Sequence, residues 1–172
     1  MSDTVKYDTI LFLDFDGTIT SQETLEGSMK LCVPPELYRE KEQEMREGKL
    51  TLAQTLHYAF EHIESSRLSD ILGYVRSVPI RDGFRELLDG MEVLQIPVVV
   101  ISGGLRPYVE EKLAPFKSKL LAVHSVELVS DRTTLQLVSP YELEGDLLEK
   151  SKVMAQYSYR EAICVGDGHT DV

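Results

Sequence analysis

The sequence predicts an α/β fold: a Rossmann-like, mostly parallel sheet with a small helical cap inserted after the first strand. Three observations predict it. Unbroken apolar runs recur along the chain and each stops at polar residues, which is typical of parallel strands buried on both faces. Helical patterns alternate with these runs, as they do in βαβ units. One long interval after the first run has helical spacing and no strand pattern.

The core elements follow from these patterns in chain order. The predicted strands are the runs at residues 9–13, 97–101, 120–123 (the weakest) and 162–165. Helical spacing precedes the second run at Phe84, Leu87, Leu88 and Met91, and precedes the last run at Leu147, Leu148, Val153 and Met154. Residues 126–129 and 134–138 predict a short hairpin, and an antiparallel addition of this kind is common on a mostly parallel sheet.

The interval from Ser21 to Val78 predicts the helical cap. Apolar residues fall at helical spacing in three places: Leu25 and Met29; Leu52, Leu56 and Phe60; Leu68, Ile71, Leu72 and Val75. Pro34-Pro35 and Glu47-Gly48-Lys49 interrupt the pattern. We therefore expect a core made of residues 1–20 and 79–172 and a cap made of residues 21–78.

Length and composition narrow the class of protein. The 172 residues fit one domain with a small insertion. The formal net charge of −11 argues against nucleic acid or an anionic membrane surface as a partner, since both need clustered cations. The longest aliphatic run, residues 98–101, is too short to span a bilayer. Two cysteines cannot form a disulfide framework, which favours a reduced, cytoplasmic setting.

Polar residues follow three of the predicted strands. They are Asp14-Phe15-Asp16-Gly17-Thr18, Ser102-Gly103-Gly104 and Gly166-Asp167-Gly168-His169-Thr170-Asp171. In an open parallel sheet, ligands bind beyond the carboxyl ends of the strands, so four carboxylates and a hydroxyl are expected in one crevice. Carboxylates held that close repel one another unless a cation joins them. Oxygen donors of this number, shared with a phosphate, favour Mg²⁺.

These motifs, in this order, resemble those of the haloacid dehalogenase superfamily of phosphatases, and the resemblance spans the chain from about Ile10 to Val172. It implies phosphoryl transfer through a covalent aspartyl-phosphate, with a small phosphorylated metabolite as substrate. It further implies that Asp14 is the nucleophile, that Asp16 is the general acid and base, and that Ser102 hydrogen-bonds the phosphoryl group. The Mg²⁺ site implied by the resemblance comprises Asp14, Asp16 through its carbonyl, Asp167 and Asp171.

The family also has a catalytic lysine before its last strand, and two lysines qualify here. Lys150-Ser151-Lys152-Val153 resembles the Lys-Gly-Lys-Val of the phosphoserine phosphatase branch, in which the first lysine is catalytic. We therefore expect Lys150 in this role, with Lys152 as the alternative. Thr18, Glu23 and Gly103 are expected at the substrate, and Thr18 is also a candidate helix cap.

The cap resembles two kinds of phosphatase within this superfamily. Glu23-Thr24-Leu25-Glu26 is similar to the Glu-Thr-Ile-Asp of phosphoserine phosphatases, but Ala59 stands near the position of their carboxylate-binding arginine. Residues 33–36, Val-Pro-Pro-Glu, resemble the methionine-salvage phosphatase that acts on 2-hydroxy-3-keto-5-methylthiopentenyl-1-phosphate. The alternatives are a phosphoserine phosphatase proper, a phosphomutase, or a signalling module that accepts phosphate without turnover. The oligomeric state is left open.

The resemblance also implies something about the end of the chain. Family members continue past the last motif, so a sequence ending at Val172 is expected to be a shortened chain. Residues 163–165 are then expected near an uncovered sheet edge.

Overall fold

The central sheet carries the first strand in its middle. The computed structural model describes residues 6–130, 133–143 and 145–168. The five strands are β1 (Tyr7–Leu13), β2 (Val98–Leu105), β3 (Ala122–Ser130), β4 (Leu135–Val138) and β5 (Tyr159–Val165). They lie in the order β4-β3-β2-β1-β5, and all pairs are parallel except β3 with β4. The predicted α/β fold with a mostly parallel sheet is confirmed.

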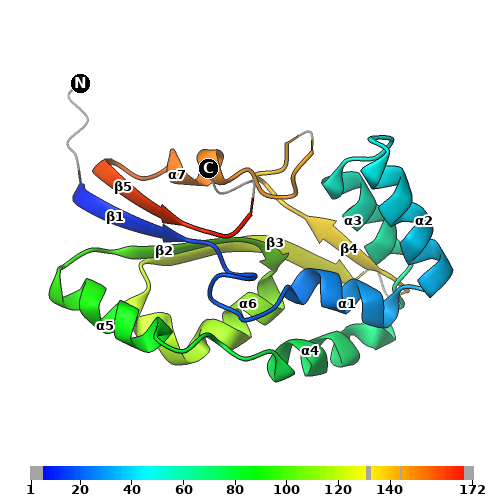
Figure 1. Ribbon diagram of the computed structural model, residues 1–172, viewed down its shortest axis with the longest axis horizontal. Coiled ribbons are helices and arrows are strands. Elements are labelled where there is room, and N and C mark those ends of the chain that lie inside the picture. The colour runs from blue at the N-terminus through cyan, green and yellow to red at the C-terminus, as the bar shows by residue number, and fades with distance from the viewer. Residues whose placement is uncertain (1–5, 131–132, 144, 169–172) are drawn as a thin grey trace.

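Both faces of β1 and β2 are covered, because these central strands are apolar on both sides. Leu11 and Leu13 of β1 belong to the core cluster beneath α5 (Phe84–Val93), α6 (Arg106–Leu113) and the 3₁₀ segment η2 (Ala114–Lys119). Ile10 and Phe12 alternate with them and belong to the opposite cluster, which includes Val153 of α7 (Lys150–Met154). Figure 1 shows α5 and α6 on one side of the sheet and α7 on the other.

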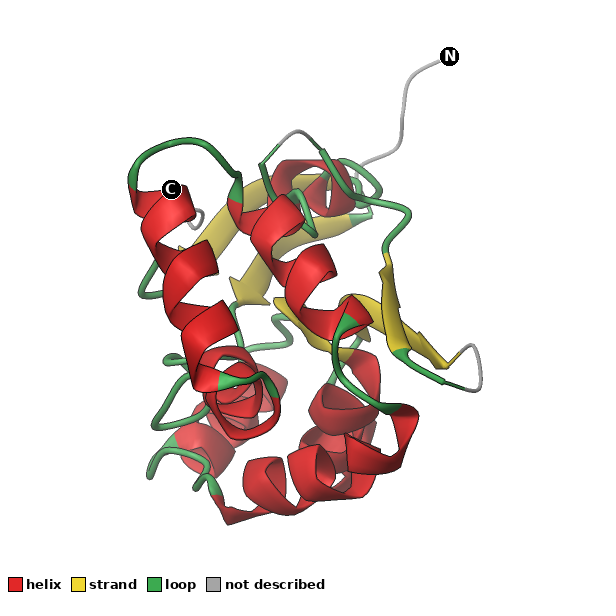
Figure 2. Ribbon diagram, turned by 90° about the vertical axis from the view of Figure 1, so that its right-hand side faces the viewer, coloured by secondary structure: helices red, strands yellow, loops and turns green. Residues whose placement is uncertain are grey.

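The helices between β1 and α5 form a bundle beside the strand ends. They are α1 (Thr24–Cys32), α2 (Pro35–Arg46), α3 (Leu52–Glu61), the 3₁₀ segment η1 (Ser65–Arg67) and α4 (Leu68–Ser77). Helices α2 and α3 lie nearest the viewer in Figure 2. The chain enters and leaves this bundle at neighbouring points, because Thr20 and Ile80 form an antiparallel bridge. Thr20 directly precedes the residues 21–78 expected as the cap, and Ile80 lies two residues after them.

Three elements differ from the sequence-based expectation, each for a physical reason. Helix α2 begins at Pro35, which supplies the fixed φ of a first helical position, and none of its residues is buried, so no apolar periodicity announces it. Strand β3 runs unbroken through residues 122–130, and therefore unites the weak fourth run with the first half of the hairpin. Leu147 and Leu148 are buried, but they precede α7 and are not helical.

Candidate active site

One pocket at the carboxyl edge of the sheet is lined by residues of all three polar motifs, but Ser102 is not among them. The volume of this pocket is about 180 Å³. The lining residues are Asp14, Asp16, Glu23, Leu25, Leu52, Leu56, Gly103, Gly104, Asp146, Leu147, Leu148, Lys150, Asp167 and Gly168. The pocket therefore brings together the ends of β1, β2 and β5, the start of α7, and residues of α1 and α3 from the helical bundle.

Asp14 directly follows β1 and forms an ion pair with a lysine of α7. The Nζ atom of Lys150 lies 2.7 Å from Oδ1 of Asp14, and the two side chains are only 16% and 10% exposed. The other candidate, Lys152, points elsewhere: its Nζ donates to the backbone carbonyl of Glu142 at 3.3 Å. The structure thus places Lys150, and not Lys152, on the carboxylate at the end of the first strand.

Asp16 is held by the first turn of α1. Its Oδ1 atom accepts hydrogen bonds from the backbone N–H of Thr24 at 2.9 Å and from the Thr24 hydroxyl at 2.5 Å. Burial raises the pKa of Asp16, and the charge of Asp167 acts in the same direction, while the bonds from Thr24 oppose the shift. Asp16 is therefore a carboxyl group held more readily in its protonated form than an exposed aspartate.

Gly17 allows the chain to turn tightly between these two aspartates and α1. Its φ of +68° lies in the left-handed region. A Cβ atom there would clash with the carboxylate of Asp167 and stand 2.9 Å from Oε1 of Glu23. The Gly17 carbonyl accepts two hydrogen bonds from Arg81, at 2.7 and 3.1 Å. Arg81 thus holds the carbonyl of the turn, while the absence of a side chain at Gly17 leaves room for the carboxylates of Asp167 and Glu23.

Ser102 lies in an irregular part of β2. The pairing of β2 with β3 shifts register between Ile101 and Leu105, as in a β-bulge. Ser102 is fully buried, and its Oγ atom accepts a hydrogen bond from the N–H of Gly104 at 2.9 Å. Its own O–H remains able to donate. A Cβ atom on Gly104 would stand 3.2 Å from Oδ2 of Asp16, so this strand approaches the β1 loop closely.

Two of the three residues expected at the substrate line the pocket and one does not. Glu23 and Gly103 line the pocket, and a Cβ atom on Gly103 would meet no atom within 4 Å. Thr18 is absent from the lining; its hydroxyl is buried and, among the described residues, has no hydrogen-bond partner. It therefore does not cap the following helix.

The carboxylates of this site are crowded, which bears on the metal expected there. Burial, and after it the charge of neighbouring carboxylates, raises the pKa of Glu23 to about 7. Crowded oxygen donors of this kind suit a hard cation such as Mg²⁺. Within residues 6–130, 133–143 and 145–168, no three His, Cys, Asp or Glu side chains converge closely enough to hold an ion. Asp171, the remaining expected ligand, lies outside the described residues. The carboxylate oxygens are of the type that Mg²⁺ prefers, but the described residues alone do not complete a set of three converging ligands.

Some residues at the site were not anticipated from the sequence. Thr24 and Arg81 hold the aspartate loop, and only a hydroxyl residue at a helix start could have pointed to Thr24. Leu25, Leu52 and Leu56 line the pocket although their spacing predicts only core packing. Arg106, which follows the Ser102-Gly103-Gly104 motif in the sequence, forms ion pairs with Glu110 and Glu127 and does not line the pocket.

Comparison with known proteins identifies the class to which this fold and site belong. The family model of haloacid dehalogenase-like hydrolases matches residues 11–172. The chain is 38% identical over 165 residues to a "2-hydroxy-3-keto-5-methylthiopentenyl-1-phosphate phosphatase" of Microcystis aeruginosa, covering 95% of this chain and 78% of that one. The chain belongs to the haloacid dehalogenase-like hydrolase family, and within it to the phosphatases.

Solved structures agree with this assignment at the level of the fold. A hydrolase of this family from Salmonella enterica serovar Typhi has a TM-score of 0.73 at 16% identity, over 98% of this chain and 59% of that one. A probable phosphoserine phosphatase from Vibrio cholerae has a TM-score of 0.72 at 20% identity, over 97% of this chain and 53% of that one. The chain thus spans less than two thirds of either protein, and at these identities the likeness concerns the fold alone.

Proposed function

We propose that this protein is a Mg²⁺-dependent phosphomonoesterase that hydrolyses a small phosphorylated metabolite through an aspartyl-phosphate. One observation carries the proposal: Asp14, at the end of the central strand, is paired with Lys150 at 2.7 Å and faces the same pocket as the buried Asp16. A carboxylate is a weak nucleophile towards a phosphate dianion and needs an adjacent cation. Two carboxyl groups placed two residues apart supply both a nucleophile and a proton donor.

In the first half of the reaction, Asp14 attacks phosphorus and the bond from phosphorus to the ester oxygen breaks. Protonated Asp16 gives its proton to the departing alkoxide, which leaves as the alcohol. Lys150 orients Asp14 and offsets the negative charge that gathers at the phosphoryl group. We propose that the O–H of Ser102 donates a hydrogen bond to a phosphoryl oxygen.

In the second half, a water molecule replaces the alcohol. Asp16, now ionised, takes a proton from this water, whose oxygen attacks the aspartyl-phosphate. The bond between Asp14 and phosphorus breaks, inorganic phosphate leaves, and both aspartates return to their starting states. We propose that Asp14, the carbonyl of Asp16, Asp167 and Asp171 hold Mg²⁺, which when bound neutralises charge on the phosphoryl oxygens.

The candidate substrate is 2-hydroxy-3-keto-5-methylthiopentenyl-1-phosphate, the compound named for the Microcystis aeruginosa relative. Support comes from the extent of that match and from Ala59, whose methyl side chain offers no charge to a substrate carboxylate. No helix in the described part of the chain is long and apolar enough to cross a membrane. We propose a cytoplasmic enzyme without nucleic-acid or membrane partners, consistent with its net charge of −11.

The test is release of inorganic phosphate from a panel of phosphorylated metabolites in the presence of Mg²⁺. The panel contains the methylthiopentenyl compound, phosphoserine and several sugar phosphates. We expect the highest kcat/KM with the methylthiopentenyl compound. Preferential hydrolysis of phosphoserine would show that phosphoserine, and not the methylthiopentenyl compound, is the substrate. Transfer of phosphate to a second position of the same molecule, without free phosphate, would show a phosphomutase. Stable phosphorylation without turnover would show a signalling module.

A further inference from the structure

Arg81 directs its positive charge at the backbone of the aspartate loop, residues 14–18. Its Nε and Nη2 atoms both donate to the carbonyl oxygen of Gly17, at 3.1 and 2.7 Å. Hydrogen bonds from a charged donor are stronger than those from a neutral one, and the planar guanidinium fixes the direction of both donors. The peptide unit between Gly17 and Thr18 is therefore held by a side chain from far along the sequence.

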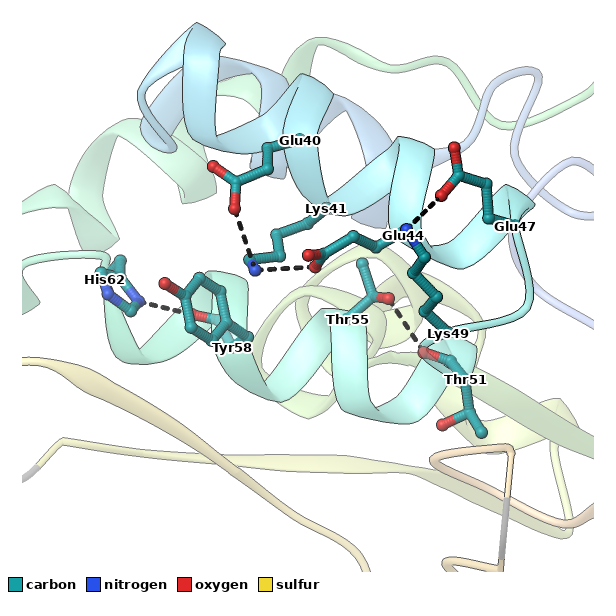
Figure 3. A network of polar contacts seen from close by, with 9 residues as sticks. All are labelled: Glu40, Lys41, Glu44, Glu47, Lys49, Thr51, Thr55, Tyr58 and His62. Carbon is teal, nitrogen blue, oxygen red and sulfur yellow. Dashed lines mark hydrogen bonds and ion pairs between the residues drawn. The ribbon is translucent and has the colours of Figure 1, made fainter.

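The charge of Arg81 has a neutral partner although carboxylates are abundant. Lys41 shows the more common arrangement in the helical segment: its Nζ lies 2.7 Å from Glu44 and 3.3 Å from Glu40, and Figure 3 shows the ammonium between these two carboxylates. In the described part of the chain, no ion pair joins Arg81 to a carboxylate. The sequence contains 29 Asp and Glu residues, so a shortage of carboxylates does not explain this choice of partner.

The backbone that carries Arg81 is itself fixed. The N–H of Arg81 donates to the carbonyl of Ile19 at 2.9 Å, beside the antiparallel bridge of Thr20 with Ile80. The arginine side chain therefore starts from a paired segment and not from an unpaired loop. This arrangement lowers the entropy that is lost when the side chain binds the Gly17 carbonyl.

Thr20 holds the preceding peptide unit of the same loop. Thr20 is fully buried, and its Oγ1 atom accepts a hydrogen bond from the N–H of Gly17 at 3.3 Å. Its hydroxyl lies 2.8 Å from the carbonyl of Gln22, to which it can donate. Because a peptide unit is planar, fixing the N–H of Gly17 also fixes the direction of the Asp16 carbonyl. Thr20 and Arg81 thus hold two successive peptide units after Asp16.

The carboxyl group of Asp16 depends on this backbone for its position. It is buried and accepts hydrogen bonds from Thr24 at 2.5 and 2.9 Å, which allow little rotation of the chain behind it. The next residue, Gly17, can reach many other backbone conformations at little cost, so the loop needs external contacts to keep one conformation. A misplacement of about 1 Å in a reacting group can cost ~10²-fold in rate.

We infer that Arg81 is a positioning residue of the proposed reaction. It does not line the catalytic pocket, and it acts through the carbonyl of Gly17. Together with Thr20 it keeps the carboxyl group of Asp16 within reach of the departing ester oxygen. The inference rests on the proposed phosphatase function and adds to it a residue that lies outside the pocket.

The experiment compares two substrates whose leaving groups differ in their need for an acid. The alkoxide of ethyl phosphate must be protonated as it departs, whereas p-nitrophenolate leaves readily without a proton. The value of kcat/KM covers the steps up to this departure. Arg81→Ala should lower kcat/KM at least ~10-fold for ethyl phosphate and less than ~3-fold for p-nitrophenyl phosphate, because general acid catalysis contributes only to the former.

Two further variants accompany Arg81→Ala. Arg85→Ala is the matched control: Arg85 is also exposed, lies in α5, and places its guanidinium over the ring of Phe116 and not on the aspartate loop. Arg85→Ala should leave the ratio of the two kcat/KM values unchanged. Arg81→Lys keeps a charged donor without the planar fork, so its ratio should lie between those of the wild type and Arg81→Ala. Circular dichroism checks that each variant is folded.

The outcomes separate the inference from the proposed function. A fall by the same factor for both substrates in Arg81→Ala, or no fall, overturns the positioning role and leaves the phosphatase function standing. So does a changed ratio in Arg85→Ala, or an Arg81→Lys variant that is as impaired as Arg81→Ala. Absence of phosphate release from every phosphomonoester by the wild type, with Mg²⁺ present, overturns the proposed function and the positioning role with it.

Discussion

The ion pair of Asp14 and Lys150 affects both the stability of the fold and the proposed reaction. The two side chains are 10% and 16% exposed, so each charge has lost most of its hydration and is stabilised by the other. Removing either partner takes away this ion pair next to Asp16, whose protonated form burial already favours. Substitutions at the two positions should therefore differ in what they remove: the attacking oxygen in one case, the neutralising charge in the other.

Asp14→Asn should abolish phosphate release while the fold is kept, because the amide still accepts a hydrogen bond from Lys150 but cannot form the acyl phosphate. The measurement is steady-state phosphate release together with circular dichroism. Asp8→Asn is the matched control: Asp8 lies on β1, the strand that Asp14 directly follows, and its side chain is 84% exposed. Turnover by Asp14→Asn at more than a small fraction of the wild-type rate would remove Asp14 as the nucleophile.

Lys150→Ala should lower kcat at least ~10²-fold, the scale of a lost group that stabilises charge in the transition state. Lys152→Ala, two residues on, should stay within a few-fold of wild type, because Lys152 contacts only a backbone carbonyl among the partners described. Both variants are assayed with the same phosphomonoester. If Lys152→Ala is the impaired enzyme, the catalytic lysine is Lys152 and not Lys150.

The loop between β1 and α1 shows how a short element places several carboxyl groups at once. Two aspartates on either side of Phe15 face one pocket only because the chain then turns through Gly17 at φ +68°. Arg81, from the far end of the helical segment, holds the carbonyl of this turn. Residues from both ends of the helical segment therefore hold the loop: Thr24 at its start and Arg81 after its end.

Gly17→Ala should destabilise the protein by at least ~1–2 kcal/mol, since an L-residue is strained at this φ, and should also impair activity because the new Cβ displaces Asp167. Gly73→Ala is the matched control. Gly73 lies within α4 and has no atom within 4 Å of an added Cβ, so alanine should raise stability by ~0.5–1 kcal/mol. Thermal melts of both variants provide the comparison. An unchanged melting temperature for Gly17→Ala would mean that the loop does not need glycine.

Burial explains part of what the sequence predicts. Strands β1 and β2 are predicted by their apolar runs, because packing on both faces of the sheet demands such residues. Strand β5 is predicted by a run of the same kind although it is mostly exposed. Helix α2 was missed because it buries none of its residues. The motif carboxylates were predicted to share one pocket, and Asp14, Asp16 and Asp167 do so. The place of Leu52 in the pocket lining was not predicted, since the sequence pattern of a leucine in a helix is the same whether it faces a core or a pocket.

The whole molecule carries a formal net charge of −11, and part of that charge converges on the catalytic pocket. Burial, and after it the repulsion among these carboxylates, raises the pKa of Glu23 to about 7. A divalent cation at this place would lower the free energy of the folded state more than that of the unfolded chain, in which the carboxylates are dispersed.

Chelation of divalent ions should therefore abolish phosphate release without unfolding the protein, and added Mg²⁺ should restore it. Mg²⁺ at about 100 times its dissociation constant should stabilise the fold by ~2.7 kcal/mol, a rise of several degrees in melting temperature. Asp167→Asn should reduce this rise, whereas Asp8→Asn should not. The same thermal shift in Asp167→Asn as in wild type would remove Asp167 from the metal site.

The bridge between Thr20 and Ile80 has a consequence for how such enzymes diversify. To the sheet, the whole helical segment is a loop that is already closed at its base, and the entropy of closing a loop grows only slowly with its length. We therefore expect changes in the length of the segment to leave the register of β1 and β2 intact as long as the helices that share a core cluster with these strands still pack on them. The strands and the residues at their ends can then keep the same reaction, while the helical segment changes under selection for new substrates.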